Sequence, residues 1–200
     1  DIAIASNGGV YVPEIKAAGI RHYSVPMHKR ELEYMLRSRK LLREIIQKEQ
    51  PDVVHAHARI PAFLCGTLHA TMHFPFVTTA HWVFETRGML RYLTNWGQRT
   101  VAVSDDIKAY LMREYGVPQE HITVTVNGID TNKFSPAISR EKVMAELGLD
   151  TSKPVISYVS RMDEDRALVA RQLVQIAKDL DGEMPGIQII ITGGGNVFDE

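Results

Sequence analysis

The sequence predicts an α/β fold built on a mostly parallel sheet, and three features of the chain point to it. Short apolar runs rich in β-branched residues alternate with longer amphipathic stretches. The amphipathic stretches have the length of helices. Glycine or proline separates many of them from the next apolar run. Strands that alternate with helices in this way form βαβ units, whose strands pair in parallel, so all-α and all-β architectures do not fit.

The composition is that of an ordinary globular protein. Of the 200 residues, 44% are hydrophobic and 24% are charged, which excludes a disordered tail, a collagen-like repeat and a coiled coil. The 23 basic and 24 acidic side chains nearly cancel, so we expect no nucleic-acid partner. The single Cys65 excludes an internal disulfide and a Cys-x-x-Cys zinc site. No apolar run reaches the roughly 18 residues that a membrane-spanning helix needs.

Local signals mark each element of the first part. Gly19 ends a short helix over residues 10–19, and Pro51 ends a long helix over 29–49 whose apolar residues recur on one face. Ser104 or Asp105 caps a helix that Gly116 ends. The strands of this part are predicted at residues 1–5, 20–25, 52–57, 76–80, 100–103 and 122–126, and the remaining helices at 61–72 and 86–97.

The chain changes character after residue 126, where a polar, turn-rich stretch begins. We place a domain boundary near Pro136, so that residues 1–136 form one Rossmann-like domain and residues 137–200 begin a second one. The second part holds a short helix and one further βαβ unit, which is thin for an independent core. We therefore expect a piece of a longer protein, with no signal peptide at its start. The elements of the second part are predicted at residues 140–147, 155–159, 163–180 and 187–191.

Ligands of an open parallel sheet bind beyond the carboxyl ends of its strands, so the residues that follow the strands are the candidates. His81 ends a strand and begins a loop, where a histidine can orient a hydroxyl or transfer a proton. Arg161 follows the strand over 155–159, and Arg166 lies near the start of the next helix. Two guanidinium groups beside a helix N-terminus suit a diphosphate. The alternative is that both arginines pair with the acidic residues at 163–165.

Gly193, Gly194 and Gly195 follow the last strand and allow the backbone to approach a ligand closely. A tight strand-to-helix turn explains the same glycines. The run is not a GxGxxG motif and no acidic residue follows at the dinucleotide spacing, so a dinucleotide-dependent oxidoreductase is disfavoured.

Metal and membrane sites have weaker signals. His55 and His57 share one face of a strand, but binding zinc would need a third ligand. His69 and His73 lie four residues apart without an HExxH motif, and the acidic run at 163–165 suits a helix start. We predict no metal site. The mixed charges of the helix over 29–49 indicate a solvated face with at most weak membrane-surface association.

Several short motifs follow one another in a fixed order. They lie at residues 52–57 (DVVHAH), 78–81 (TTAH), 101–104 (VAVS), 126–130 (VNGID) with 134–136 (FSP), 158–161 (YVSR) and 191–195 (ITGGG). Together they resemble the family 4 glycosyltransferases, which are retaining enzymes of GT-B architecture, over essentially the whole chain. The Asn-Gly-Ile-Asp and Phe-Ser-Pro motifs at 127–136 are the most distinctive part.

The resemblance implies two Rossmann-like domains that face a cleft, an N-terminal one for the acceptor and a C-terminal one for a nucleotide-diphosphate sugar. His81 would be the catalytic residue near the sugar and the acceptor. Arg161 and Arg166 would hold the donor diphosphate. The glycines at 193–195 would approach the nucleoside, and Asn127 and Gly128 would lie at the hinge beside the cleft. The family's first strand and the later segment that carries two glutamates are missing, so this piece alone would be inactive.

The resemblance further implies front-face transfer with retention, no cofactor and no obligatory metal. The acceptor would be a saccharide, a lipid-linked compound or a small molecule. The setting would be cell-envelope polysaccharide or glycolipid synthesis in the cytoplasm, at the inner face of the membrane if the chain associates with it. Arg166 stands where the family usually has lysine, and Trp82 stands where many members have Asp or Gly. Two alternatives stay open: a nucleotide-sugar 2-epimerase and a non-catalytic nucleotide-sugar-binding module.

Overall fold

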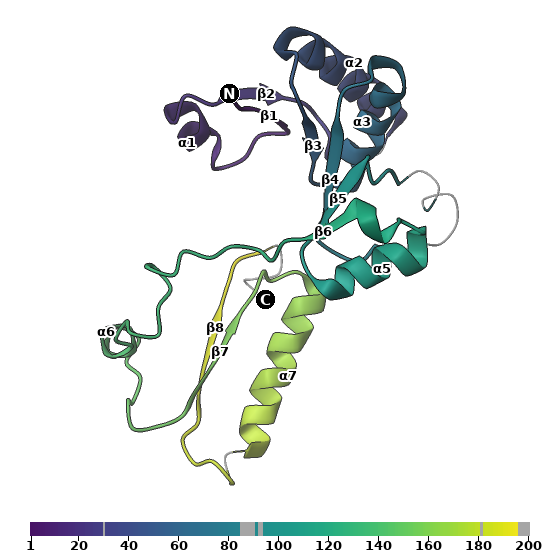
Figure 1. The fold of residues 1–200 in the computed structure, drawn as a ribbon. Helices are drawn as coiled ribbons and strands as arrows, with labels where there is room; N and C mark the ends of the chain where they lie inside the picture. The colour runs from purple at the N-terminus through teal and green to yellow at the C-terminus, as the bar shows by residue number, and fades with distance from the viewer. Residues whose placement is uncertain (30, 85–90, 92–93, 181, 196–200) are drawn as a thin grey trace. The chain divides into compact units, whose positions relative to one another are not determined.

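The computed structural model describes residues 1–29, 31–84, 91, 94–180 and 182–195, and it confirms the predicted α/β class. Every strand pairing among these residues is parallel. The chain divides into two compact units, Asp1–Gly128 and Ile129–Glu200 (Figure 1). The division falls a few residues before the boundary that we place near Pro136. The polar stretch that begins the second unit, over residues 129–140, is almost fully exposed.

The first unit contains two parallel sheets. The smaller one pairs β1 (Ala3–Ser6) with β2 (Arg21–Ser24), which are connected by helix α1 (Val12–Ala17). The larger one has four strands in chain order, namely β3 (Val54–Ala56), β4 (Phe76–Ala80), β5 (Arg99–Ala102) and β6 (Ile122–Val124). Since these four strands are parallel, their carboxyl ends lie at one edge of the sheet.

Two helices, α2 (Leu32–Glu49) and α3 (Arg59–Met72), contact each other and contribute most of the first core. The predicted apolar face of α2 is confirmed in the second half of the helix, where Leu42 and Ile46 are buried. It is wrong for the first two turns, because Leu32 and Leu36 are 73% and 60% exposed. Residues of the strands and of the segments beside them complete this core. Its fully buried members include Val25, Leu64, Leu68 and Phe76.

Helix α5 (Asp105–Tyr115) packs its apolar side against β5 and β6 to form a second core. The Ser104 hydroxyl accepts a hydrogen bond from the backbone N–H of Ile107 at 3.3 Å and so caps the helix. Gly116 ends it with a left-handed φ of 65°. A 3-10 turn, η1 (Gln119–His121), then leads into β6. Both predicted helix ends are therefore confirmed.

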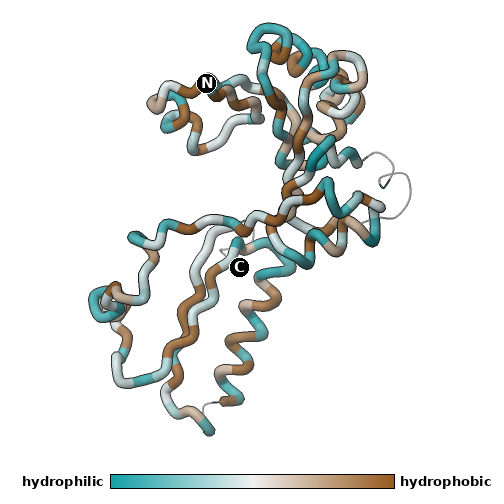
Figure 2. Tube along the Cα trace, viewed as in Figure 1, coloured by the Kyte–Doolittle hydropathy of each residue, from teal (hydrophilic) through white to brown (hydrophobic). Residues whose placement is uncertain are grey.

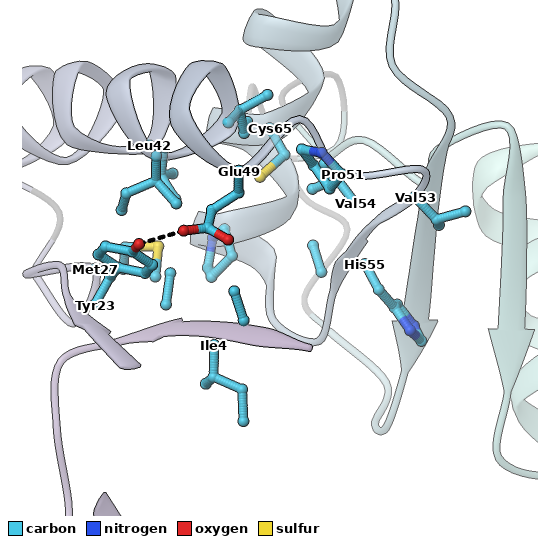
Figure 3. Close-up of a pocket in the computed structure, with 16 residues that line it drawn as sticks. Ile4, Tyr23, Met27, Leu42, Glu49, Pro51, Val53, Val54, His55 and Cys65 are labelled. Carbon is cyan, nitrogen blue, oxygen red and sulfur yellow. Dashed lines mark hydrogen bonds between the residues drawn. The ribbon is translucent and has the colours of Figure 1, made fainter. Parts of the chain in front are cut away.

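An open groove of about 820 Å³ is lined by β1 on one side and by β3 on the other. Neither strand has a partner at that edge among the described residues, since β1 pairs with β2 and β3 pairs with β4. An adjoining pocket of about 150 Å³ is largely apolar, and Figure 3 shows Ile4 of β1 and Leu42 of α2 on its walls. Glu49 at the end of α2 accepts hydrogen bonds from Tyr23 and Arg21 and ties α2 to β2.

The second unit is one βαβ unit with a short preceding helix, α6 (Glu141–Glu146). Strands β7 (Val155–Val159) and β8 (Gln188–Thr192) pair in parallel, and α7 (Glu164–Leu180) connects them. Figure 2 shows apolar colour along much of β8 and on parts of α7. The buried apolar side chains of the described part of this unit are only Met144, Met162 and Ala170. Its core is therefore small.

One predicted helix needs correction. Residues 86–90 and 92–93 of the helix predicted over 86–97 lie outside the described residues, but 94–97 form a loop. Asn95 Oδ1 accepts a hydrogen bond from the Gly97 N–H at 2.8 Å, and Gly97 has a left-handed φ of 70°. This turn is incompatible with a continuing helix.

None of the helices that the structure describes is both long and apolar enough to cross a bilayer.

The second core gives a direct test of the packing of α5. Leu111 is fully buried, so we expect Leu111→Ala to lower the free energy of unfolding by about 2–5 kcal/mol. Its neighbour Met112 is 38% exposed, and Met112→Ala should cost less than about 1 kcal/mol. Urea unfolding followed by circular dichroism measures both values. Equal losses in the two variants would contradict the observed orientation of α5.

Candidate active site

Three histidines lie together where strands β3 and β4 end. His55 lies within β3 and His57 directly after it, on the same face, and His81 directly follows β4. The ring centroids of His55 and His57 are 4.2 Å apart, and those of His57 and His81 are 5.5 Å apart. The parallel register that pairs His55 with Val77 and Ala56 with Thr78 brings these side chains together. The structure thus places His81 at the carboxyl edge of the sheet, where the sequence predicts it.

Hydrogen bonds connect this histidine cluster, which consists of His55, His57 and His81, to the sheet and to itself. His55 Nε2 lies 2.7 Å from Thr79 Oγ1, and Thr79 is nearly buried in β4. His57 Nδ1 lies 3.2 Å from His81 Nε2. A single proton lies between these two nitrogens when both rings are neutral, so the tautomer of one ring determines that of the other. His81 is exposed, and its Nδ1 has no partner among the described residues.

Burial and mutual repulsion lower the pKa of two members of the cluster. For His55, partial burial is the larger cause and the nearby His81 the smaller. For His57, burial again comes first, followed by His55 and then His81. These shifts favour the neutral form of both rings at pH 7 more than in an ordinary histidine.

The metal readings of the sequence find no support in the described part of the chain. No group of three or more His, Cys, Asp or Glu side chains there has an arrangement that could hold a metal ion. His69 Nδ1 instead lies 2.7 Å from the carbonyl oxygen of Phe74, at the end of α3. His73 terminates the same helix with a left-handed φ of 55°. These two histidines serve the end of a helix rather than one ligand set.

The loop after His81 is anchored to α5. The backbone N–H of Phe84 donates to the Tyr110 hydroxyl at 2.8 Å, and that hydroxyl donates to the Phe84 carbonyl at 2.7 Å. The guanidinium of Arg59 lies over the Phe84 ring at 5.0 Å. Trp82, which lies in the chain between His81 and Phe84, is 66% exposed. A large aromatic side chain therefore stands in solvent directly beside His81.

In the second unit, the two predicted arginines have different surroundings. Arg161 follows β7 and is exposed, and its guanidinium has no hydrogen-bond or ion-pair partner within the described ranges. Arg166 forms an ion pair with Asp163 across the first turn of α7. Asp163 Oδ1 also accepts the Arg166 backbone N–H at 3.2 Å and so caps the helix. The alternative, in which each arginine pairs with an acidic side chain at 163–165, therefore holds for Arg166 and not for Arg161 in the described part of the chain.

The glycines after β8 are explained in part by backbone packing. A Cβ on Gly193 would lie 1.7 Å from the Ser160 carbonyl oxygen, and a Cβ on Gly195 would lie 2.2 Å from that of Met162. The Met162 N–H donates to the Gly194 carbonyl at 3.1 Å, which holds the two loops together. Gly194 alone of the three has open space at its Cβ position. The loop thus lies beside the loop that carries Arg161, and Gly194 is its most accessible member.

Asn127 and Gly128 are exposed and lie at the end of the first unit, where the chain passes into the second. This is the place at which the sequence predicts a hinge. His81 belongs to the first unit, whereas Arg161, Arg166 and Gly193–Gly195 belong to the second.

Sequence reasoning missed the contact between His57 and His81. His57 was a candidate as a residue that follows a strand, but the only role considered for it was that of a metal ligand beside His55. The signal was available, because two histidines at alternate positions end one strand and a third histidine ends another. What was lacking was the strand order, which places β3 beside β4.

Comparisons with known proteins identify the family of the chain. Residues 3–133 match the family described as Glycosyltransferase Family 4. An alpha-maltose-1-phosphate synthase of Mycolicibacterium smegmatis is 29% identical over 165 residues, which cover 73% of this chain and 41% of that protein. A UDP-Gal:alpha-D-GlcNAc-diphosphoundecaprenol alpha-1,3-galactosyltransferase of Escherichia coli is 24% identical over 207 residues, or 90% of this chain and 51% of that protein. The chain thus spans about half or less of the length of these relatives.

Solved structures show the same fold. A glycosyltransferase from Rickettsia africae matches with a TM-score of 0.69 at 23% identity, over 98% of this chain and 60% of that one. Anabaena HepE in complex with UDP-glucose matches with a TM-score of 0.67 at 15% identity, over 96% of this chain and 61% of that one. A UDP-N-acetylglucosamine 2-epimerase from Rickettsia bellii shares the fold less closely, with a TM-score of 0.55 at 15% identity over 94% of this chain and 54% of that one.

The parallel α/β fold is that of the GT-B glycosyltransferases, and the family match covers most of the first unit together with its histidine cluster. The chain belongs to glycosyltransferase family 4.

Proposed function

We propose that the protein is a retaining glycosyltransferase that moves a sugar from a nucleotide-diphosphate sugar to a hydroxyl of an acceptor. The observation that carries this proposal is the exposed His81 at the carboxyl edge of a parallel sheet, in a chain of glycosyltransferase family 4. Ligands of such sheets bind beyond this edge. An exposed imidazole there can meet a sugar hydroxyl.

The donor diphosphate would be held by Arg161 and Arg166. The guanidinium fork matches phosphate oxygens, and Arg161 is exposed and unpaired among the described residues. Arg166 would have to exchange Asp163 for the phosphate, so Arg161 carries the larger part of the binding in this proposal. Gly194 has the space to approach the nucleoside. The complex of HepE with UDP-glucose supports a nucleotide-sugar donor for this fold.

The reaction would proceed by front-face transfer, with retention at the anomeric carbon. Charge develops on the leaving diphosphate as the glycosidic bond to it breaks. Preorganised cations stabilise such charge most strongly in the transition state. Basic side chains would supply this stabilisation without a cofactor or an obligatory metal.

The acceptor would be a saccharide, a lipid-linked compound or a small molecule, bound beside His81. Trp82 offers it an exposed aromatic face. The name of the Escherichia coli relative includes a diphosphoundecaprenol compound, which supports a lipid-linked acceptor. The setting would be cell-envelope polysaccharide or glycolipid synthesis. The protein would then work in the cytoplasm, at the inner face of the membrane. Asn127 and Gly128 would be the hinge between acceptor and donor domains.

A nucleotide-sugar 2-epimerase is the second candidate, because proteins of that activity share the fold. An epimerase needs no acceptor. Incubation with donor alone therefore separates the two activities, since only an epimerase converts the sugar under that condition.

Donor binding is tested by the melting temperature of the whole protein with UDP-, GDP- and ADP-sugars. A ligand at about 100 times its dissociation constant stabilises the folded state by roughly 2.7 kcal/mol. We expect one nucleotide to raise the melting temperature, and we expect Arg161→Ala with Arg166→Ala to abolish the shift. Lys178→Ala, at the exposed end of α7, is the matched control and should keep it. A shift that survives the double substitution would remove both arginines from the site.

The role of His81 is tested by His81→Ala in a transfer assay with donor and acceptor. Loss of a proton-transferring or hydroxyl-orienting group should lower kcat about 100-fold or more, whereas the donor-induced melting shift should persist. His121→Ala, in the 3-10 turn before β6, removes a histidine away from the cluster and should leave kcat unchanged. Unchanged kcat in His81→Ala would overturn the assignment.

A further inference from the structure

Besides the proposed catalytic residue His81, the histidine cluster contains two further histidines, His55 and His57. His81 contacts its surroundings through Nε2, which lies 3.2 Å from His57 Nδ1. The two ring planes are inclined by 28° and the ring centroids are 5.5 Å apart, so the rings meet at their nitrogen edges. His57 in turn lies against the ring of His55, which Thr79 holds at 2.7 Å. A chain of contacts thus runs from a nearly buried side chain of β4 to the exposed His81.

The direction of the hydrogen bond between His57 and His81 follows from the chemistry of imidazole. The Nε2–H form is the more stable tautomer of a neutral histidine. If both rings adopt it, His81 Nε2–H donates to the lone pair of His57 Nδ1, and neither ring is in its less favourable form. His81 Nδ1 is then left with a free lone pair. That nitrogen can accept a hydrogen bond but cannot donate one.

We propose that His57 is a positioning residue that holds His81 in its Nε2–H tautomer. In this tautomer His81 Nδ1 is free to accept a hydrogen bond from the substrate hydroxyl. The inference rests on the proposed function, in which His81 meets that hydroxyl. It adds a second residue to the site and gives His81 a defined role: its Nδ1 accepts a hydrogen bond from the hydroxyl that attacks the sugar.

The electrostatic surroundings agree with a neutral acceptor at His57. The titratable groups that face it are His55 on its own strand and His81 after β4. No carboxylate forms a hydrogen bond or ion pair with any of the three histidines in the described part of the chain. Burial and these neighbours lower the pKa of His57 below its ordinary value of 6.5. A neutral His57 ring in its Nε2–H form has the Nδ1 lone pair that the hydrogen bond from His81 needs.

Acid should reverse the arrangement. Once His57 is protonated, its Nδ1–H donates to His81 Nε2, and His81 must carry its own proton on Nδ1. Because burial and the neighbouring histidines lower the pKa of His57, this reversal should begin at a lower pH than the protonation of an ordinary histidine. Activity that depends on the Nδ1 lone pair should fall as the reversal proceeds.

Nitrogen NMR of the ¹⁵N-histidine-labelled whole protein tests the proposal without any substrate. At pH 7.5 we expect His81 to show a protonated Nε2 and an unprotonated Nδ1. His57→Phe keeps an aromatic ring and removes both nitrogens, so His81 should become a mixture of tautomers. His57→Asn places an amide near the position of Nδ1, and its oxygen can accept the His81 Nε2–H, so the share of the Nε2–H form should rise above that in His57→Phe. A protonated Nδ1 in the wild-type protein, or an unchanged His81 in His57→Phe, would overturn the proposal.

Kinetics provide the second readout. One hydrogen bond is worth about 0.5–1.5 kcal/mol, so His57→Phe should lower kcat up to about tenfold while the KM for the donor stays the same. His57→Asn should recover most of kcat, and His121→Asn serves as the distant control. A change confined to the donor KM would contradict a positioning role. If the protein proves to have no transferase activity, the NMR result still decides whether His57 controls the tautomer of His81.

Discussion

Parallel pairing of β3 with β4 is the constraint on which the candidate site depends. Strands that run in the same direction end at the same edge, so residues far apart in the chain come together there. The register that sets His55 opposite Val77 carries His57 and His81 to within hydrogen-bond distance. A shift of one residue would turn His55 and His57 to the other face of the sheet and separate the cluster.

Buried polar contacts also stabilise the sheet that carries the histidine cluster. Thr78 and Thr100 are both buried, and both hydroxyls donate to the carbonyl of Trp96, at 2.7 and 2.5 Å. These bonds fix the loop over 94–97 against β4 and β5. Tyr110 holds the loop after His81 through two further hydrogen bonds to Phe84. The exposed His81 therefore lies between a sheet and a loop whose backbones are both held in place.

The two units differ in the size of their hydrophobic cores. The first unit has two apolar cores and four paired strands around its histidines. In the second, the small core leaves much of α7 exposed, and the proposed donor residues follow β7 and β8 in two loops that are bonded to each other. The groove between β1 and β3 leaves an edge of each of those strands unpaired among the described residues.

The sequence alone determined the secondary structure, because its signals are local. Apolar spacing, the Ser104 cap and the glycines at helix ends act within a few residues, and they predict nearly every element that the structure contains. The exception among described residues is the loop over 94–97, where the Asn95 turn outweighs the helical pattern. The ordered motifs also indicated the family, since they place particular residues after particular strands.

Only the tertiary structure decided which of those residues act together. Strand order is a long-range property that no local pattern carries, so the partnership of His57 with His81 was not predictable from spacing. Likewise, the sequence could not separate an arginine with an acidic partner from one without, and the fold pairs Arg166 with Asp163 while leaving Arg161 exposed. The crowding of Gly193 and Gly195 against the loop after β7 depends on the pairing of β7 with β8, which is again non-local. Local interactions determine the helices and strands of this protein. The contacts between those elements determine which side chains lie together at the strand ends.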